Sequence, residues 1–365
     1  MNKTGFGFLR PPWLGPAEEK QIDYTKLNRI VDRFLELGGT VFDTAYTYLG
    51  GLSEEAIRKS LVERHPRDRY VLVDKLPGYL AKADCQAYFD ESLRRCGVTY
   101  FDRYLLHWLT AENYAIAEQY DQFRFLREIK AAGKAGKIGF SYHDSPELLD
   151  KILTDHPEVD CVLLQINYLD WDSVSLRARA CYETAVRHGV SVMVMEPVKG
   201  GSLANLPAEA EQCLRDIRPA DSAASWAIRF AADLDAVDVV LSGMNTMEQL
   251  EDNLRDLPPL TEADRDALTR AAEIIRSNTA VACTGCGYCV PHCPLGMPIP
   301  QYFTLYNEYA RHPGEDWKMQ YAYNALAERQ VKASACADCK QCEAHCPQNL
   351  EIAAALAKTA AAFEG

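Results

Sequence analysis

The sequence contains no apolar run long enough to cross a bilayer, and residues 1–10 lack the basic stretch followed by an apolar core that marks a signal peptide. Both absences favour a cytoplasmic location. Positive charge is also scarce, because 39 Lys and Arg stand against 52 Asp and Glu, which gives a formal net charge of −13. So acidic a chain is a poor ligand for nucleic acid or an anionic membrane, and neither is expected as a main partner.

Cysteine is sparse before residue 275. The five cysteines scattered there are expected to be small apolar packing residues: Cys85, Cys96, Cys161, Cys181 and Cys213. The other eight of the thirteen cysteines fall in two tight groups near the end of the chain. In a cytoplasmic protein such groups indicate metal sites rather than disulfides.

The part of the chain before these groups alternates short apolar runs with amphipathic stretches. The runs predict strands at residues 5–9, 40–43, 70–75, 101–107, 137–140, 161–165, 190–195 and 237–241. The stretches predict helices at residues 26–37, 54–63, 84–96, 114–132 and 173–188. Eight strand–helix units over about 250 residues predict an α/β fold of the (β/α)8 TIM barrel type. A doubly wound open sheet is the competing interpretation, but no Gly-x-Gly-x-x-Gly follows the first strand.

Composition changes near residue 278. Residues 261–277 predict one further helix that closes the barrel domain, whereas residues 278–365 are rich in Cys, Pro and Tyr and end in an Ala-rich helix. We therefore predict two domains, a barrel over residues 1–277 and a small, mainly helical iron–sulfur domain over residues 278–365. No low-complexity linker separates them, so a docked domain is expected rather than a tethered one.

Both cysteine groups have the spacing C-x2-C-x2-C-x3-C-P. Three thiolates so close in sequence can hold one face of a 4Fe–4S cube, while the fourth cysteine ligates the other cluster in two-cluster ferredoxins. The predicted ligands of the first cluster are Cys283, Cys286, Cys289 and Cys346, and those of the second are Cys336, Cys339, Cys342 and Cys293. Structural zinc is the alternative, but it usually takes paired C-x2-C units. Helices predicted near residues 301–311 and 316–329 make this domain resemble alpha-helical ferredoxins.

Three stretches of the predicted barrel resemble motifs of the aldo-keto reductases. They are residues 42–48 with Ser53 and Glu54, residues 71–75, and residues 102–108. They occur in the family's order and on successive predicted strands. The resemblance extends from about Gly5 to Asn253, and it implies a barrel oxidoreductase.

Four residues of these motifs are predicted to be catalytic. Asp43, Lys75 and His107 lie at the C-terminal ends of predicted strands, and Tyr48 lies in the following loop, on the face where barrel enzymes build active sites. A carbonyl reduced by hydride needs a proton at its oxygen. Tyrosine has a pKa of about 10, and a nearby ammonium lowers it. Tyr48 is therefore the predicted general acid, Lys75 its activator, Asp43 the partner of Lys75, and His107 the group that orients the carbonyl.

The resemblance also implies a site for NADP(H) or NAD(H). The residues at the matching positions are Ser141, Gln165, Pro197, Gly200, Ser242, Gly243, Met244, Asn245, Gln249 and Asn253. Met195 stands where the family's stacking tyrosine usually lies. Gly243 and Gln249 replace cations that often meet the 2′-phosphate, so the choice between NADP and NAD stays open.

Iron–sulfur clusters pass single electrons, whereas a nicotinamide passes a hydride. A flavin can do both, which makes it a possible occupant of the barrel. The leading hypothesis is a cytoplasmic iron–sulfur aldo-keto reductase that interconverts a small carbonyl compound and its alcohol, with a possible electron-transfer protein as partner. The alternatives are an electron-transfer adaptor and a redox-sensing binding protein, in which the barrel docks a partner. The intact set of Asp43, Tyr48, Lys75 and His107 favours the enzyme.

Overall fold

The computed structural model describes residues 3–15, 21–173, 176–256, 258–311 and 316–365. The chain forms two compact units. The barrel unit comprises Met1–Asp172, Arg177–Val198 and Ala224–Leu260, and the cysteine unit comprises Ser173–Leu176, Lys199–Ala223 and Thr261–Gly365. The predicted domain boundary at residues 277/278 stays a prediction.

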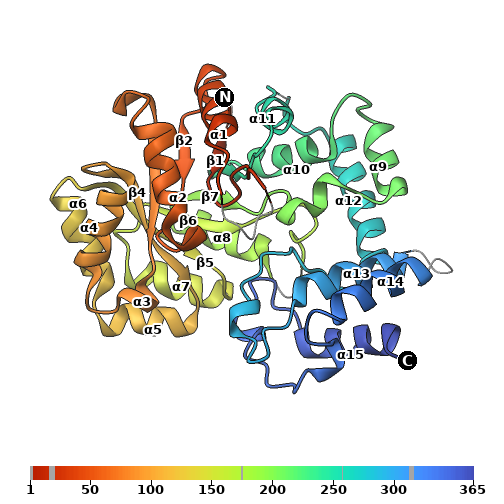
Figure 1. The fold of residues 1–365 in the computed structure, drawn as a ribbon. Helices are drawn as coiled ribbons and strands as arrows, with labels where there is room; N and C mark the ends of the chain where they lie inside the picture. Colours follow the sequence, from red (N-terminus) through yellow and green to blue (C-terminus); the bar gives the residue numbers. More distant parts are fainter. Residues whose placement is uncertain (1–2, 16–20, 174–175, 257, 312–315) are drawn as a thin grey trace. The chain divides into compact units, whose positions relative to one another are not determined.

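The barrel unit contains a closed barrel of eight parallel strands in which each strand pairs with the next along the chain and β8 pairs with β1 (Figure 1). The strands are β1 Thr4–Gly7, β2 Val41–Asp43, β3 Val71–Leu76, β4 Phe101–Leu109, β5 Ala135–Tyr142, β6 Cys161–Gln165, β7 Ser191–Met195 and β8 Val237–Ser242. Each predicted apolar run coincides with one of these strands. The predicted (β/α)8 fold is therefore confirmed.

The barrel interior is filled by side chains from several strands. Val73 on β3, Leu105 on β4, Leu163 on β6, Met193 on β7 and Leu241 on β8 belong to one buried cluster. Because successive side chains of a strand point to opposite faces, the next inward position on β3 after Val73 is Lys75. Asp74 between them points outward, toward the surrounding helices.

Helices flank the strands of the barrel unit. They are α1 Tyr24–Glu36, α2 Leu52–Ile57, α3 Gly78–Ala81, α4 Cys85–Cys96, α5 Ala111–Gln119, α6 Gln122–Ala131, α7 Pro146–Asp155, α8 Ala178–Arg187, α10 Ala223–Ala232 and α11 Met247–Asn253. The single helix predicted over residues 114–132 is two helices, because Asp121 between them has a φ of 51°. The helix predicted over residues 173–188 includes residues 174–175, which lie outside the described residues.

The cysteine unit is mainly helical. Its helices are α9 Ala208–Arg215, α12 Glu262–Ser277, α13 Ile299–Arg311, α14 Asp316–Ala327 and α15 Ile352–Phe363. α13 packs against α14 and α15 around a core that includes Tyr302, Phe303, Tyr323, Leu356 and Phe363. Among the described residues of both units, no helix is long and apolar enough to span a membrane.

The two cysteine loops have the same backbone. The third and fifth positions of each motif, and the second residue after it, have a positive φ: Gly285, Gly287 and Gly296 in the first loop, and Asp338, Lys340 and Asn349 in the second. A short 3-10 turn precedes the last cysteine in each, at Val290–His292 and Glu343–His345. The common spacing of the two motifs therefore corresponds to a common loop conformation.

Candidate active site and cysteine loops

The four predicted catalytic residues converge at the C-terminal ends of β2, β3 and β4. Lys75 is fully buried, and its Nζ donates to Oδ1 and Oδ2 of Asp43 at 2.6 and 2.7 Å and to the carbonyl of Thr44 at 2.7 Å. The same Nζ lies 3.4 Å from the hydroxyl of Tyr48. A buried ammonium needs oxygen partners to offset its lost hydration, and these contacts supply them.

The electrostatics around Tyr48 differ from the expectation based on Lys75 alone. Burial raises the pKa of Tyr48 well above its ordinary value of 10.0, and the nearby negative charges of Asp43 and Glu196 raise it further. The pKa of Asp43 is also raised by burial, although Lys75 acts in the opposite direction. Because Asp43 largely compensates the charge of Lys75, the site keeps Tyr48 protonated.

His107 lies beside Tyr48 at an irregularity of β4. Their ring centroids are 5.6 Å apart with the rings nearly perpendicular, and Nδ1 of His107 lies 3.5 Å from Oγ1 of Thr47. Burial, Lys75 and then His143 lower the pKa of His107 well below 6.5, so its imidazole is neutral near pH 7.

The irregularity itself is centred on Trp108. The register between β4 and β5 shifts between Leu106 and Leu109, and Trp108 has a φ of 62°, which bulky residues rarely adopt. Its backbone N–H donates to Oγ of Ser141 at 2.7 Å. Backbone strain of this kind is typical of functional sites, and here it fixes the end of the strand that carries His107.

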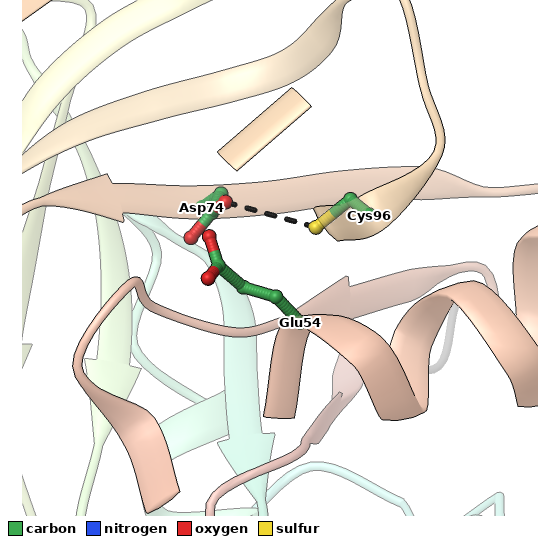
Figure 2. Close-up of side chains that lie close together, drawn as sticks. All are labelled: Glu54, Asp74 and Cys96. Carbon is green, nitrogen blue, oxygen red and sulfur yellow. Dashed lines mark hydrogen bonds between the residues drawn. The ribbon is translucent and has the colours of Figure 1, made fainter. Parts of the chain in front are cut away.

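A second buried polar cluster lies on the outer side of β3, directly behind Lys75. Figure 2 shows Glu54, Asp74 and Cys96 turned toward one another. Asp74 Oδ1 accepts a hydrogen bond from the N–H of Lys75 at 2.7 Å, the Cys96 thiol donates to Asp74 Oδ2 at 3.8 Å, and Arg95 donates to Glu54 Oε2 at 2.9 Å.

Two carboxyl groups this close cannot both be ionised without cost. Burial and then the charge of Glu54 raise the pKa of Asp74 well above its ordinary value of 3.8. Arg95 pairs with Glu54, and the raised pKa of Asp74 favours the protonated form of that carboxyl group. The cluster is therefore a proton-sharing support for the backbone of Lys75, although its three groups have ligand-like spacing.

The residues predicted to hold a nicotinamide ring lie at the ends of β5, β6 and β7. Gln165 ends β6 and is buried, and its Nε2 has no hydrogen-bond partner within the described residues. Ser141 on β5 is buried beside Trp108. Pro197 follows β7 and is also buried. An orphaned amide donor in this position fits a bound group that offers a carbonyl oxygen.

The segment after β8 is folded by its own polar residues. Ser242 Oγ accepts a hydrogen bond from Nδ2 of Asn253 at 2.9 Å, and Oε1 of Gln249 accepts one from the N–H of Asn245 at 2.9 Å. Met244 is fully buried. Gln249 thus stabilises the loop with the side chain that the sequence assigned to cofactor binding.

Gly200, another predicted cofactor residue, lies in the cysteine unit. A Cβ built on Gly200 would approach the carbonyl oxygen of Thr284 to 2.4 Å, so Gly200 packs tightly against the first cysteine loop. Its φ of 66° also favours glycine. The structure groups Gly200 with the cluster ligands, whereas Ser141, Gln165, Ser242 and Asn253 belong to the barrel unit.

The cysteine loops bring together the first predicted quartet and three members of the second, in the crossed arrangement. Cys283, Cys286, Cys289 and Cys346 line one pocket. Burial and then the charges of those other three cysteines raise the pKa of Cys289 to about 12. For the second quartet, burial raises the pKa of Cys342 to about 11, with contributions from Cys293 and Cys336. Cys339, the fourth predicted member, is exposed. Groups of converging thiols fit iron–sulfur clusters.

The histidines beside the last cysteines pack on each other. The rings of His292 and His345 stack with centroids 3.3 Å apart. The stack joins the two cysteine loops next to the residues that cross between quartets. His292 and His345 therefore support the loops in a symmetric manner.

Sequence reasoning missed two cations near these sites. The side chain of Arg10 lies over Gly243, where its Cβ and Cδ are 3.7 and 4.0 Å from the position of a Cβ on that glycine. Lys199 is buried, and its Nζ donates to Oε1 of Gln348 at 2.8 Å. Arg10 follows β1 at the end where barrel sites form, which was a usable signal. Lys199 is paired with a residue 149 positions away, and no local pattern indicated it.

Comparison with known proteins agrees with this architecture. The aldo/keto reductase family model matches residues 5–273, and the 4Fe-4S dicluster domain model matches residues 282–351. An aldo-keto reductase of Mycolicibacterium smegmatis is 29% identical over 255 residues, which are 64% of this chain and 84% of the relative.

Solved structures have the same barrel. An aldo-keto reductase of Bacillus halodurans in its holo form matches with a TM-score of 0.60 and 27% identity, covering 74% of this chain and 91% of that one. An aldo-keto reductase of Klebsiella pneumoniae in complex with NADPH matches in fold, with a TM-score of 0.58 at 20% identity over 73% of this chain and 90% of that one.

This chain belongs to the aldo/keto reductase family, since the family model matches well over half of it. It is therefore an oxidoreductase. Its C-terminal region also contains a dicluster domain for 4Fe–4S clusters, so the chain comprises more than the aldo/keto reductase barrel.

The proton on Asp74 can be tested by stability measurements. The folded protein keeps a proton that the unfolded chain releases above pH 3.8, so Asp74 makes folding less favourable as the pH rises. Asp74→Asn removes this titration but keeps the acceptor for Lys75, and it should be at least as stable as the parent at pH 8. Asp74→Ala leaves a buried N–H unpaired and should cost about 1–3 kcal/mol.

Urea unfolding at pH 5 and pH 8 measures both effects. The advantage of Asp74→Asn over the parent should grow with pH. An Asn variant as unstable at pH 8 as the Ala variant would contradict a protonated Asp74.

The crossed ligation predicts which cluster each last cysteine supports. Cys293→Ser should damage the cluster of the second motif, and Cys346→Ser the cluster of the first, because each serine replaces the ligand that the other loop supplies. Cys213→Ser is the matched control, since Cys213 lies outside both motifs on α9. Electron paramagnetic resonance of the reduced, anaerobically purified proteins, with iron analysis, distinguishes the two clusters. The opposite pattern of damage would overturn the assignment.

Proposed function

We propose that this protein is an iron–sulfur aldo-keto reductase that interconverts a small carbonyl compound and its alcohol. The observation that carries the proposal is the buried Lys75 ammonium, which binds both oxygens of Asp43 and lies 3.4 Å from the Tyr48 hydroxyl. A protonated phenol beside a fixed cation is suited to deliver a proton to a developing alkoxide.

Tyr48 is the proposed general acid. Burial keeps its pKa high, so the hydroxyl carries its proton throughout the neutral pH range. As negative charge develops on the substrate oxygen, the proton moves from the Tyr48 hydroxyl to that oxygen. Lys75 then stabilises the phenolate that remains, and Asp43 keeps Lys75 in place.

His107 is the proposed orienting group. Its neutral imidazole has one N–H, which can donate a hydrogen bond to the carbonyl oxygen without competing with Tyr48 for charge. Thr47 contacts its Nδ1 and the strained turn at Trp108 fixes the strand end that carries it. Rigid placement of this kind reduces the entropy that is lost when the reacting groups reach a reactive geometry.

NADP(H) is the proposed electron donor to the barrel. When bound, the nicotinamide supplies or accepts the hydride. The orphaned Nε2 of Gln165 fits the oxygen of its carboxamide, with Ser141 adjacent on the neighbouring strand. The Klebsiella structure with the same barrel is a complex with NADPH, which is consistent with this occupant. A flavin remains the alternative that analysis of released cofactors would identify.

Arg10 is the proposed partner of the 2′-phosphate. Glycine and glutamine occupy positions 243 and 249, where relatives often have cations, but Arg10 lies over Gly243. A guanidinium binds phosphate oxygens in a fixed fork geometry, which Lys lacks. Arg10 thus replaces the missing cations from a different part of the sequence.

The proton-transfer assignment predicts a specific loss of activity. Tyr48→Phe should reduce turnover of a small aldehyde by about 100-fold or more, because the general acid is gone while the ring remains. Tyr70→Phe is the matched control. Its hydroxyl is buried at the start of β3, at the other end of the barrel strands, and has no hydrogen-bond partner among the described residues.

Steady-state reduction under anaerobic conditions is the measurement. If the barrel only docks a partner, Tyr48→Phe and Tyr70→Phe would both behave as the parent. That result would favour the electron-transfer adaptor.

The phosphate assignment predicts a change in cofactor preference. Arg10→Ala should raise the KM for NADPH by about 10- to 100-fold, since it removes one charged hydrogen-bond partner worth about 1.5–3 kcal/mol. The KM for NADH should change little, because NADH has no 2′-phosphate. Arg29→Ala on α1 is the exposed control. Equal losses with both cofactors would count against Arg10 as the phosphate ligand.

A further inference from the structure

Lys199 lies beside the first cysteine quartet. It is 3% exposed, and its Nζ donates to Oε1 of Gln348, the second residue after the cluster ligand Cys346. Gln348 lines the same pocket as the four cysteines of the first quartet. A buried cation thus lies within electrostatic range of the thiolates that hold the first cluster.

The first loop also packs tightly against the residue that follows this cation. Gly200, the residue after Lys199, allows the carbonyl oxygen of Thr284 to approach within 2.4 Å of where a Cβ would lie. Lys199 itself has a φ of 47°, a backbone conformation that non-glycine residues adopt infrequently. The loop therefore holds the ammonium in a defined position, away from the screening effect of water.

The second quartet has a charge of the opposite sign nearby. Glu343 directly follows Cys342, a predicted ligand of the second cluster. Oε1 of Glu343 accepts a hydrogen bond from the N–H of Ala353 at 2.9 Å, which fixes the carboxylate at the start of α15. The matching position of the first motif is Val290, which has no charge.

Gln348, which accepts the hydrogen bond from Lys199, also distinguishes the two cysteine loops. Gln348 is the first residue after the second motif and is 4% exposed, whereas the first residue after the first motif is Leu295 and is 46% exposed. The two loops have the same backbone but differ in the charges around them. Their difference therefore lies in electrostatics rather than in ligation.

We propose that Lys199 and Glu343 set the two 4Fe–4S clusters to different reduction potentials, with the first cluster as the stronger electron acceptor. One-electron reduction adds one negative charge to a cluster. A fixed ammonium stabilises that added charge at the first cluster, and a fixed carboxylate opposes it at the second. The first electron that enters the domain then resides on the cluster held by Cys283, Cys286, Cys289 and Cys346.

Two substitutions test the two charges separately. Lys199→Gln should lower the midpoint potential of the higher-potential cluster, and Glu343→Gln should raise that of the lower-potential cluster. The measurement is an anaerobic redox titration of the full-length holoprotein with dithionite, followed by electron paramagnetic resonance. Iron and acid-labile sulfide content are checked in every variant, so that a shift is read only from loaded clusters.

A further variant tests the same charge in case Lys199→Gln does not fold. Gln348→Glu changes one atom of the anchor and places a carboxylate against Lys199, so it should also lower the higher midpoint. Lys358→Gln is the matched control, because Lys358 is exposed on α15, lies outside both motifs and should shift neither midpoint.

Two outcomes would overturn the proposal. One is that Lys199→Gln and Gln348→Glu, with clusters loaded, leave both midpoints unchanged. The other is that a charge removal acts on the wrong cluster, either because Lys199→Gln moves the lower midpoint or because both substitutions move the same midpoint. Carbonyl reduction does not enter these readings, so the test is independent of the proposed activity.

Discussion

The buried ammonium of Lys75 is the constraint around which the barrel site is organised. A charge with no solvent exposure persists only with oxygen partners, and Asp43 and Thr44 provide them from the end of β2. This fixes the loop that carries Tyr48 against the end of β3. On the reverse side of the strand, Asp74 accepts the hydrogen bond of the Lys75 N–H. Lys75 thus belongs to the site, while Asp74, the residue before it on β3, supports the Lys75 backbone from the other face of the strand.

The electrostatic result is a site that favours neutral forms. Asp43 compensates Lys75, and burial keeps Tyr48 protonated and His107 neutral. The expectation that Lys75 lowers the pKa of Tyr48 considered one charge without the burial and the carboxylates around it. A general acid must hold its proton before it can donate it, so the high pKa of Tyr48 is consistent with that chemistry.

Sequence was sufficient for features with a local or periodic signature. Apolar runs located all eight strands, and cysteine spacing located the four cysteines that line one pocket. It was insufficient where two distant segments meet. The break at Asp121 depends on a single left-handed residue, the carboxyl pair of Glu54 and Asp74 comes from a helix and a strand, and Lys199 meets Gln348 across 149 positions. None of these features produces a regular spacing of residues in the sequence.

The connection after β7 contains a glycine whose packing role differs from the role that the resemblance implies, and its place in a cofactor site stays a prediction. By resemblance, Gly200 belongs to a cofactor site, but it packs against Thr284 in the cysteine unit. Val198 and Lys199 are consecutive and belong to different compact units. A glycine at position 200 is required by its positive φ and by the close carbonyl, whatever the barrel binds. The same residue type therefore satisfies a family pattern while serving a different packing requirement, and only the tertiary contacts distinguish the two.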